Sequence, residues 1–173
     1  MNKDLKKIKI GIIFPGNHFF NNILPALEKN LNINIYSVLC RNLRKKKKFK
    51  NIKHIHFPYE ASVQKRVEIY NLADIFICTS IEDSGPSTLT EVMSCGIPVV
   101  AFDTGDAQKY IVNNYNGYKV RLKDVTDLEN KIFKIFSLKK AEIDLFSKNS
   151  RNFVLNNLNK DKQLIISKGY FYD

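Results

Sequence analysis

Residues 72–120 of this 173-residue chain, LADIFICTSIEDSGPSTLTEVMSCGIPVVAFDTGDAQKYIVNNYNGYKV, decide the fold. An apolar run at Asp74–Cys78 is followed by a loop, by a helix that begins near Ser87, and by a second apolar run at Pro98–Phe102. Short runs of β-branched and aromatic residues between turn residues are typical of buried strands. Because strands alternate with helices, this stretch predicts βαβ crossovers and a parallel sheet.

The same alternation extends to both sides of this stretch. The other predicted strands are Ile8–Phe14, Asn34–Leu39, Ile52–Phe57 and Gly117–Val120. The predicted helices are Phe19–Lys29, Ala61–Leu72, Ser87–Ser94, Ala107–Val112, Val125–Ser137 and Ala141–Leu158. In the helix Ala61–Leu72 the spacing places these apolar residues mostly inward: Val63, Val67, Ile69, Tyr70 and Leu72.

No repeat and no linker rich in Gly, Ser or Pro divides the chain. The predicted fold class is therefore α/β, with residues 1–173 forming a single Rossmann-like domain around a doubly wound, mostly parallel sheet. In such sheets a ligand binds outside the carboxyl ends of the strands. The loops that follow Phe14, Phe57, Cys78 and Phe102 are the ones expected at this edge.

The composition is that of a globular chain, with 44% hydrophobic and 12% aromatic residues. No apolar run approaches the ~20 residues that cross a bilayer. The N-terminus lacks a signal-peptide core, since Ile8–Phe14 is short and is followed by Pro15. The three cysteines, Cys40, Cys78 and Cys95, show no CxxC spacing. They predict reduced, buried thiols and a cytoplasmic location rather than a disulfide framework or a metal site.

Much of the net charge of +11 lies in Arg41–Lys50 (RNLRKKKKFK). One interpretation is a solvated loop. Another is a patch that brings the protein to the inner face of the membrane, where each basic residue contributes ~1 kcal/mol of attraction to anionic lipid. A nucleic-acid partner is not expected, because Phe49 is the one aromatic residue in the run and no recognised binding module accompanies it.

The segment between Thr79 and Gly96 contains the start of a predicted helix. Gly85-Pro86 predicts a tight turn, and Ser87 in the N-cap role would leave the backbone N–H groups of Thr88–Thr90 directed out of the helix end. These donors and the positive end of the helix dipole suit a diphosphate.

Two carboxylates accompany this helix start. Asp83 and Glu91 are poor partners for phosphate but good acceptors for sugar or ribose hydroxyls. Taken singly, Asp83 could cap a turn and Glu91 could lie in the first turn of the helix, where acids are favoured anyway. Together with the surrounding pattern, they predict a ligand that has both phosphates and hydroxyls.

The order of these motifs resembles the donor-binding core of retaining glycosyltransferase family 4 (glycosyl transferases group 1), in the GT-B superfamily. That family has an A-D-[VI]-[FL] strand, a serine, an E-x7-E motif, an E-A-M-A-C-G helix, a P-V-V-A strand, a G-G turn and an N-G-[YF] turn. The counterparts are Ala73–Phe76, Ser80, Asp83 with Glu91, Glu91–Gly96, Pro98–Ala101, Gly105-Asp106 and Asn116–Tyr118. The resemblance is strong over the second third of the chain and loose elsewhere.

The resemblance implies a nucleoside-diphosphate sugar as substrate, with no cofactor and no metal. Asp83, in place of the usual glutamate, is the implied catalytic residue and contacts hydroxyls of the transferred sugar. Glu91 binds the ribose hydroxyls, and the base packs near Phe57–Tyr59. The implied donor-binding set is Asp83, Ser84, Gly85, Pro86, Ser87, Thr88, Leu89 and Glu91.

The chain departs from the family pattern after its first predicted strand. The family has a G-R-x5-K motif there, whose cations stabilise the leaving diphosphate. Residues 14–20 contain neither Arg nor Lys, and an ordinary histidine pKa near ~6.5 leaves His18 mostly neutral at pH 7. His54 and His56 share one face of a strand but lack an evident third ligand, so we expect a structural role.

A second departure concerns the domain that binds the acceptor. GT-B enzymes have two Rossmann-like domains, and this chain starts almost at the first strand of the C-terminal one. The acceptor half is therefore expected to come from another polypeptide, unless the chain is a fragment. The predicted function is donor binding for sugar transfer to a glycan or a lipid-linked acceptor, in cell-surface polysaccharide synthesis. The alternatives are a non-catalytic nucleotide-sugar-binding module and a truncated remnant of such an enzyme.

Overall fold

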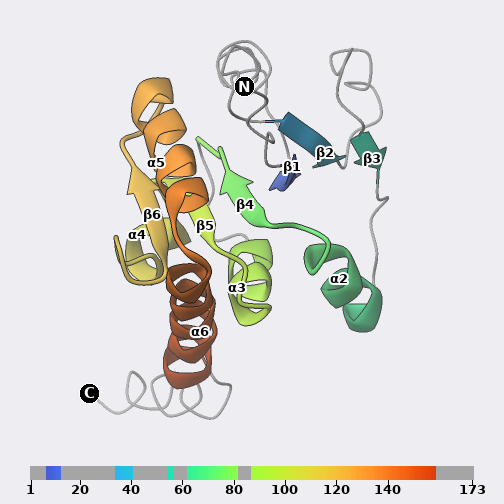
Figure 1. Cartoon of the computed structure of the whole chain (residues 1–173). Coiled ribbons are helices and arrows are strands. Elements are labelled where there is room, and N and C mark those ends of the chain that lie inside the picture. The colour runs from blue at the N-terminus through green and yellow to red at the C-terminus, as the bar shows by residue number, and fades with distance from the viewer. Residues whose placement is uncertain (1–6, 13–33, 41–53, 57–61, 82–86, 159–173) are drawn as a thin grey trace, which may run out of the picture.

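The structure is a computed structural model, and it describes residues 7–12, 34–40, 54–56, 62–81 and 87–158. The strands form one six-stranded sheet in the order β3-β2-β1-β4-β5-β6 (Figure 1). They are β1 (Lys7–Ile12), β2 (Asn34–Cys40), β3 (His54–His56), β4 (Ile75–Cys78), β5 (Val99–Phe102) and β6 (Gly117–Val120). Each neighbouring pair is parallel. This is the order of a doubly wound Rossmann sheet, with the switch between β1 and β4, so the predicted fold class is confirmed.

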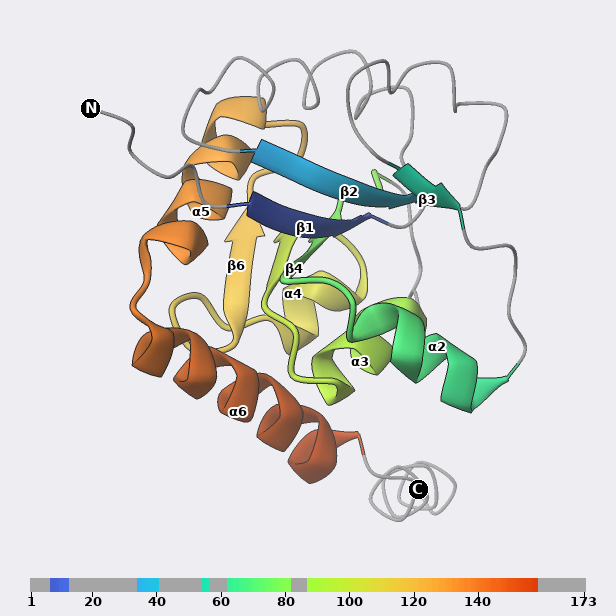
Figure 2. The ribbon, with the colours of Figure 1, turned by 45° about the vertical axis from the view of Figure 1, so that its right-hand side comes forward.

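Five helices connect and cover the described strands. They are α2 (Val63–Tyr70), α3 (Ser87–Ser94), α4 (Asp106–Tyr110), α5 (Val125–Ser137) and α6 (Lys140–Asn157). Figures 1 and 2 both show α2 beside α3, and α6 passing close to α3. The helix predicted at Phe19–Lys29 and the basic run Arg41–Lys50 lie outside the described residues. The other predicted helices are confirmed, with small shifts at their ends.

The inward face predicted for the helix at 61–72 is only partly correct. Tyr70 is buried, and Val67 and Ile69 are half-buried. Val63 and Leu72, however, are 66% and 47% exposed. Both lie at the margins of the helix, since α2 begins at Val63 and its C-cap is Asn71. The apolar period therefore holds within α2 and fails at its two ends.

The core lies on both faces of β4 and β5, because successive side chains of a strand point to opposite faces. Phe76, Val99 and Ala101 belong to one buried cluster that also contains the apolar side chains of α3. Val100 and Phe102 point to the opposite face and are fully buried, and α5 contacts β5 on that side. Both faces of β4 and β5 are therefore buried.

The end of α3 explains the glycine in the Cys-Gly pair of the family pattern. Gly96 has φ +73, in the left-handed region that favours glycine. Its N–H donates to Met93 O at 3.0 Å, and Ile97 N–H donates to Val92 O at 3.3 Å. These two bonds form a Schellman motif, which ends the helix and returns the chain to β5.

The turn before β6 is fixed by a buried asparagine and a glycine. Asn116 Oδ1 accepts from Val112 N–H at 2.7 Å, and its Nδ2 donates to Tyr110 O at 2.9 Å. A Cβ on Gly117 would lie 2.6 Å from Val99 O, so only glycine lets β6 approach β5 here. The Asn-Gly pair that carried part of the family resemblance is therefore structural.

Cys78 and Cys95 are half-buried thiols. Within the described part of the chain, no helix is both long enough and apolar enough to cross a membrane.

Candidate functional site

The carboxyl ends of β4 and β5 lie side by side at one edge of the sheet. Phe76 pairs with Val99 and Cys78 with Ala101, so the loops that follow the two strands begin next to each other. Thr104 Oγ1 donates to Ser80 O at 3.2 Å and joins these two loops. Gly105, with φ 51, then turns the chain into α4. The predicted serine and G-G-type turn are thus brought together at the edge where such sheets bind ligands.

The loop between β4 and α3 carries several predicted donor-binding residues. Asp83, Ser84, Gly85 and Pro86 lie outside the described residues, and so does the side chain of Ser87. The predicted roles of these residues in donor binding therefore stay predictions.

Helix α3 begins at Ser87, as predicted. The first N–H groups of an α-helix have no acceptor within the helix, and they carry the positive end of its dipole. The side chain of Leu89 is 1% exposed and belongs to the core cluster. Leu89 is thus buried as a whole residue, whereas the half-buried Thr88 retains some exposed surface.

Glu91 lies on α3 and is bound by two side chains from α2. Arg66 Nε donates to Glu91 Oε2 and Arg66 Nη2 to Oε1, each at 3.2 Å. Tyr70 Oη donates to Oε2 at 2.7 Å. Arg66 and Tyr70 are four residues apart, so they lie on the same face of α2. The network is partly buried, with side-chain exposures of 25% for Arg66 and 32% for Glu91.

The alternative role for Glu91, as an acid in the first turn of a helix, is wrong. The first turn of α3 contains no acidic residue, because the helix begins at Ser87 and Glu91 lies in the second turn. At this position the helix dipole gives little stabilisation, since its effect falls off within the first turn. The environment of Glu91 is set by Arg66 and Tyr70.

Burial raises the pKa of Tyr70, and the hydrogen bond to Glu91 and the charge of that carboxylate raise it further. The charge of Arg66 acts in the opposite direction but does not cancel these effects. The Tyr70 hydroxyl therefore keeps its proton at neutral pH and remains a donor to Glu91. Burial also raises the pKa of the nearby Cys95 thiol, which disfavours the reactive thiolate.

Arg66 is the residue that sequence reasoning missed. Its partner is 25 residues further along the chain, so the pair depends on how α2 packs against α3. The available signal was a basic residue four positions before Tyr70, on the inward face of a predicted helix. Within the described residues, no group of three or more His, Cys, Asp or Glu could hold a metal ion.

The sequence profile described as "Glycosyl transferases group 1" matches residues 22–153. The matched region includes α2, β4, α3 and Glu91. This chain belongs to the glycosyl transferases group 1 family.

Two curated relatives agree with this assignment. An uncharacterized glycosyltransferase of Methanocaldococcus jannaschii is 26% identical over 111 residues, which are 64% of this chain and 28% of that protein. The N,N'-diacetylbacillosaminyl-diphospho-undecaprenol alpha-1,3-N-acetylgalactosaminyltransferase of Campylobacter jejuni is 26% identical over 102 residues, which are 59% of this chain and 26% of that protein. The matched part of this group 1 chain therefore spans about a quarter of each relative.

Solved structures share the fold. The C-terminal domain of a glycosyl transferase group 1 family protein from Francisella tularensis superposes with a TM-score of 0.67 at 19% identity, covering 88% of this chain and 87% of that one. S. aureus TarM, in a complex that includes UDP, gives 0.74 at 17% identity, covering 99% of this chain and 37% of that one. Such identities show the fold alone. The fold of this group 1 chain is therefore similar to that of the Francisella tularensis domain.

Proposed function

We propose that this domain binds the nucleoside-diphosphate sugar of a glycosyltransferase at the carboxyl edge of β4 and β5. The observation that carries the proposal is the carboxylate of Glu91, held by Arg66 and Tyr70 on a helix that starts at this edge. A carboxylate at that place can accept from ribose hydroxyls, while the helix N-terminus takes the diphosphate. The UDP present in the TarM complex supports a nucleotide of this class.

In this proposal, different residues of the loop before α3 and of α3 itself bind different parts of the donor. Glu91 takes the ribose and Asp83 the transferred sugar, and Asp83 is the proposed catalytic residue. The base lies near Phe57–Tyr59. The diphosphate meets the backbone around the start of α3 at Ser84, Gly85, Pro86, Ser87, Thr88 and Leu89. Donor binding requires no cofactor or metal, because backbone N–H groups and a helix dipole supply the stabilisation.

The proposed reaction is transfer with retention, of the kind found in glycosyltransferase family 4. The acceptor is a glycan or a lipid-linked sugar of cell-surface polysaccharide synthesis, and the name of the Campylobacter jejuni relative supports a lipid-linked acceptor. Transfer needs donor and acceptor in near-attack contact, which can lower the activation free energy by up to ~7–11 kcal/mol. We propose that an acceptor-binding domain beyond residues 1–173 provides this contact.

The proposed location is cytoplasmic, with peripheral membrane contact through Arg41–Lys50.

A second candidate is a nucleotide-sugar-binding module without turnover, or a remnant of an enzyme. The observation that favours it is the absence of Arg and Lys from residues 14–20. Cations at that position would stabilise the leaving diphosphate. The two candidates share the donor site and differ in whether an added acceptor domain yields transfer.

Isothermal titration of the 173-residue chain with UDP, GDP and ADP tests the shared donor site. We expect weak binding of at least one nucleotide, with the same affinity in EDTA as in magnesium. Replacing Glu91 with Gln removes a charge-assisted hydrogen bond to ribose, worth ~1.5–3 kcal/mol. It should therefore weaken the bound nucleotide about tenfold or more and its 2′,3′-dideoxy analogue much less.

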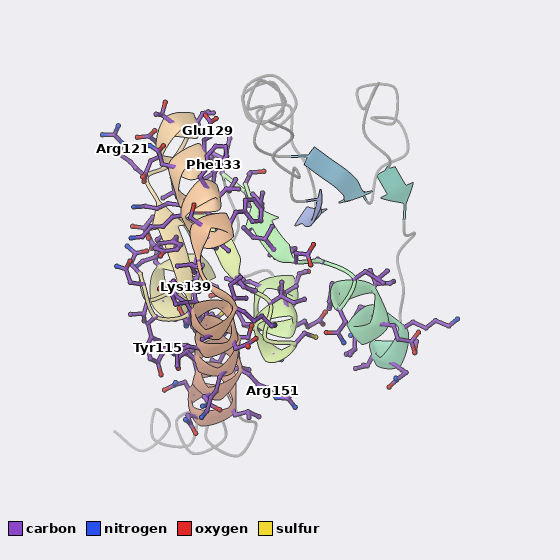
Figure 3. The ribbon with its side chains drawn as sticks, in the orientation of Figure 1. Tyr115, Arg121, Glu129, Phe133, Lys139 and Arg151 are labelled. Atoms are coloured by element: carbon purple, nitrogen blue, oxygen red, sulfur yellow. The ribbon has the colours of Figure 1, made fainter. Side chains whose placement is uncertain are left out.

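The matched control for this titration is Glu129→Gln on α5, which changes a carboxylate away from the proposed site (Figure 3). This control should bind like the original chain. No binding of any of the three nucleotides at millimolar concentration would contradict the donor site. Equal losses for the nucleotide and its dideoxy analogue would show that Glu91 does not contact the ribose.

A further inference from the structure

Helix α2 supplies both side chains that bind the Glu91 carboxylate. We propose that Arg66 and Tyr70 are positioning residues, which hold this carboxylate so that Oε1 faces a ribose hydroxyl and which offset its charge beside the diphosphate. The inference rests on the proposed donor site at Glu91. It adds a helix outside the family motif to the recognition of the nucleotide.

The hydrogen bonds fix the carboxylate in one orientation. Arg66 contacts both oxygens from a planar guanidinium, and such two-point contacts restrict rotation as well as distance. Tyr70 adds a third bond, to Oε2. With both residues in place, Glu91 cannot turn about its last bond without losing at least one of these contacts.

The network leaves the carboxylate with room for a ligand. A carboxylate has about four acceptor positions, two on each oxygen. Among the described residues, Arg66 and Tyr70 together fill both positions of Oε2 and one of Oε1. The remaining position of Oε1 can accept a hydroxyl, and the 32% exposure of the Glu91 side chain makes it reachable.

Charge balance gives a second reason for Arg66. A bare carboxylate beside a helix N-terminus that binds a diphosphate would repel the ligand. The Arg66 guanidinium, 3.2 Å from Glu91 Oε1, offsets this charge without competing for the helix N–H groups. In partly buried surroundings such compensation is stronger than in bulk water, because the effective dielectric constant is lower.

Stability alone gives a weak reason for this network. Replacing ion pairs by packed apolar residues is often neutral or stabilising where the charges are removed from water. Tyr70, 8% exposed, is the one residue of α2 that is buried, so apolar packing between α2 and α3 does not itself require a hydroxyl or an ion pair. The polar network is better explained by a need to hold Glu91 as an oriented acceptor.

The test compares UDP with 2′,3′-dideoxy-UDP in titrations of the full chain, the Tyr70→Phe variant and the Arg66→Lys variant. Phe keeps the ring of Tyr70 and removes only the hydroxyl, and Lys keeps the charge of Arg66 but loses the two-point contact. Each variant should bind UDP about three- to tenfold more weakly and the dideoxy analogue less than twofold more weakly. The ratio of the affinity for UDP to the affinity for 2′,3′-dideoxy-UDP should therefore fall in both variants.

A third variant separates charge from orientation. Arg66→Gln removes the positive charge, so it should weaken both nucleotides, and more at low salt than at high salt. The controls are Tyr110→Phe on α4 and Arg121→Lys, which changes an arginine that pairs with Asp124. Figure 3 shows Arg121 on the side of the molecule away from α2. Both controls should keep the affinities of the original chain.

The outcomes distinguish this inference from the proposed function. If the original chain binds none of UDP, GDP and ADP, the donor site fails and this inference fails with it. If GDP or ADP binds in place of UDP, the same comparison is made with that nucleotide and its 2′,3′-dideoxy analogue. If UDP binds and Glu91→Gln abolishes the ribose preference, but Tyr70→Phe and Arg66→Lys keep it, the donor site stands and the positioning role is wrong. A purely structural role would lower the thermal midpoint of these variants and leave the ratio of UDP to dideoxy-UDP affinity unchanged.

Discussion

At the scale of single residues, polar side chains removed from water fix the local geometry where they find hydrogen-bond partners. Asn116 is fully buried and satisfies two backbone groups at the end of α4, Val112 N–H and Tyr110 O. Glu91 plays a comparable part between α3 and α2, but its remaining exposure makes it available to a ligand. The same physical requirement thus produces a structural residue in one place and a candidate site in the other.

We expect Asn116→Ala to destabilise the fold without removing any ligand contact. Each of the two backbone groups left unpaired and buried costs about 1–3 kcal/mol. Urea unfolding followed by circular dichroism measures this loss. Asn130→Ala, at an exposed position on α5, is the control, and it should be neutral or slightly stabilising because Ala has the higher helix propensity. Similar stability of the Asn116 variant and the original chain would contradict the role given to this side chain.

At the scale of helices and strands, the sequence predicted much of what the structure contains. The strands at 74–78, 98–102 and 117–120 follow from apolar runs between turn residues, and the parallel pairing of the strands follows from their alternation with helices. The ends of α2 were less predictable, because Val63 and Leu72 continue the apolar period but are 66% and 47% exposed. Local periodicity cannot show where packing stops.

The candidate site could be predicted only in part, because the local sequence does not show which helices pack together. Glu91 and the start of α3 at Ser87 were found from local spacing and from the family resemblance. The Arg66 and Tyr70 contacts were not, because they arise from the packing of two helices that are separated in sequence. A motif search finds residues that lie near each other in sequence, whereas a partner from another helix requires the fold.

Helix α5 offers a prediction about pH. Its N-cap, Asp124, accepts from Asp127 N–H at 2.9 Å. This backbone hydrogen bond, together with the Arg121 side chain, holds the pKa of Asp124 below its ordinary value of 3.8. Because the pKa is lower in the folded chain, the stabilisation is present above the ordinary value and is lost as the pH falls through the folded-state pKa.

The Asp124→Ala variant should therefore melt at a lower temperature than the original chain at neutral pH. The difference should shrink in acid, as the original chain loses the charged cap. Asp144→Ala on α6 is the control, since Asp144 makes an exposed pair with Lys140 and should contribute little at any pH. A difference for Asp124→Ala that is constant from neutral to acid pH would show that the ionised cap does not stabilise α5.

At the scale of the whole molecule, the parallel sheet brings distant segments to one edge. The strand order places β4 and β5 together, and the Thr104 to Ser80 hydrogen bond joins the loops that follow them. Helix α3 follows β4 along the chain, and Arg66 and Tyr70 of α2 bind Glu91 on this helix. The fold thus gathers a helix N-terminus, a held carboxylate and two strand ends, which together suit a nucleoside diphosphate.

The most direct measurement is a titration of the ¹⁵N-labelled 173-residue chain with UDP, followed by the shifts of its backbone amide signals. A diphosphate at the start of α3 and a ribose at Glu91 should produce the largest shifts at Thr88, Leu89 and Glu91, with smaller ones at Tyr70. The amides of α5 and the C-terminal half of α6 should stay in place. Largest shifts on α5 or α6, with the first turn of α3 unchanged, would contradict the claim that this edge binds the nucleotide.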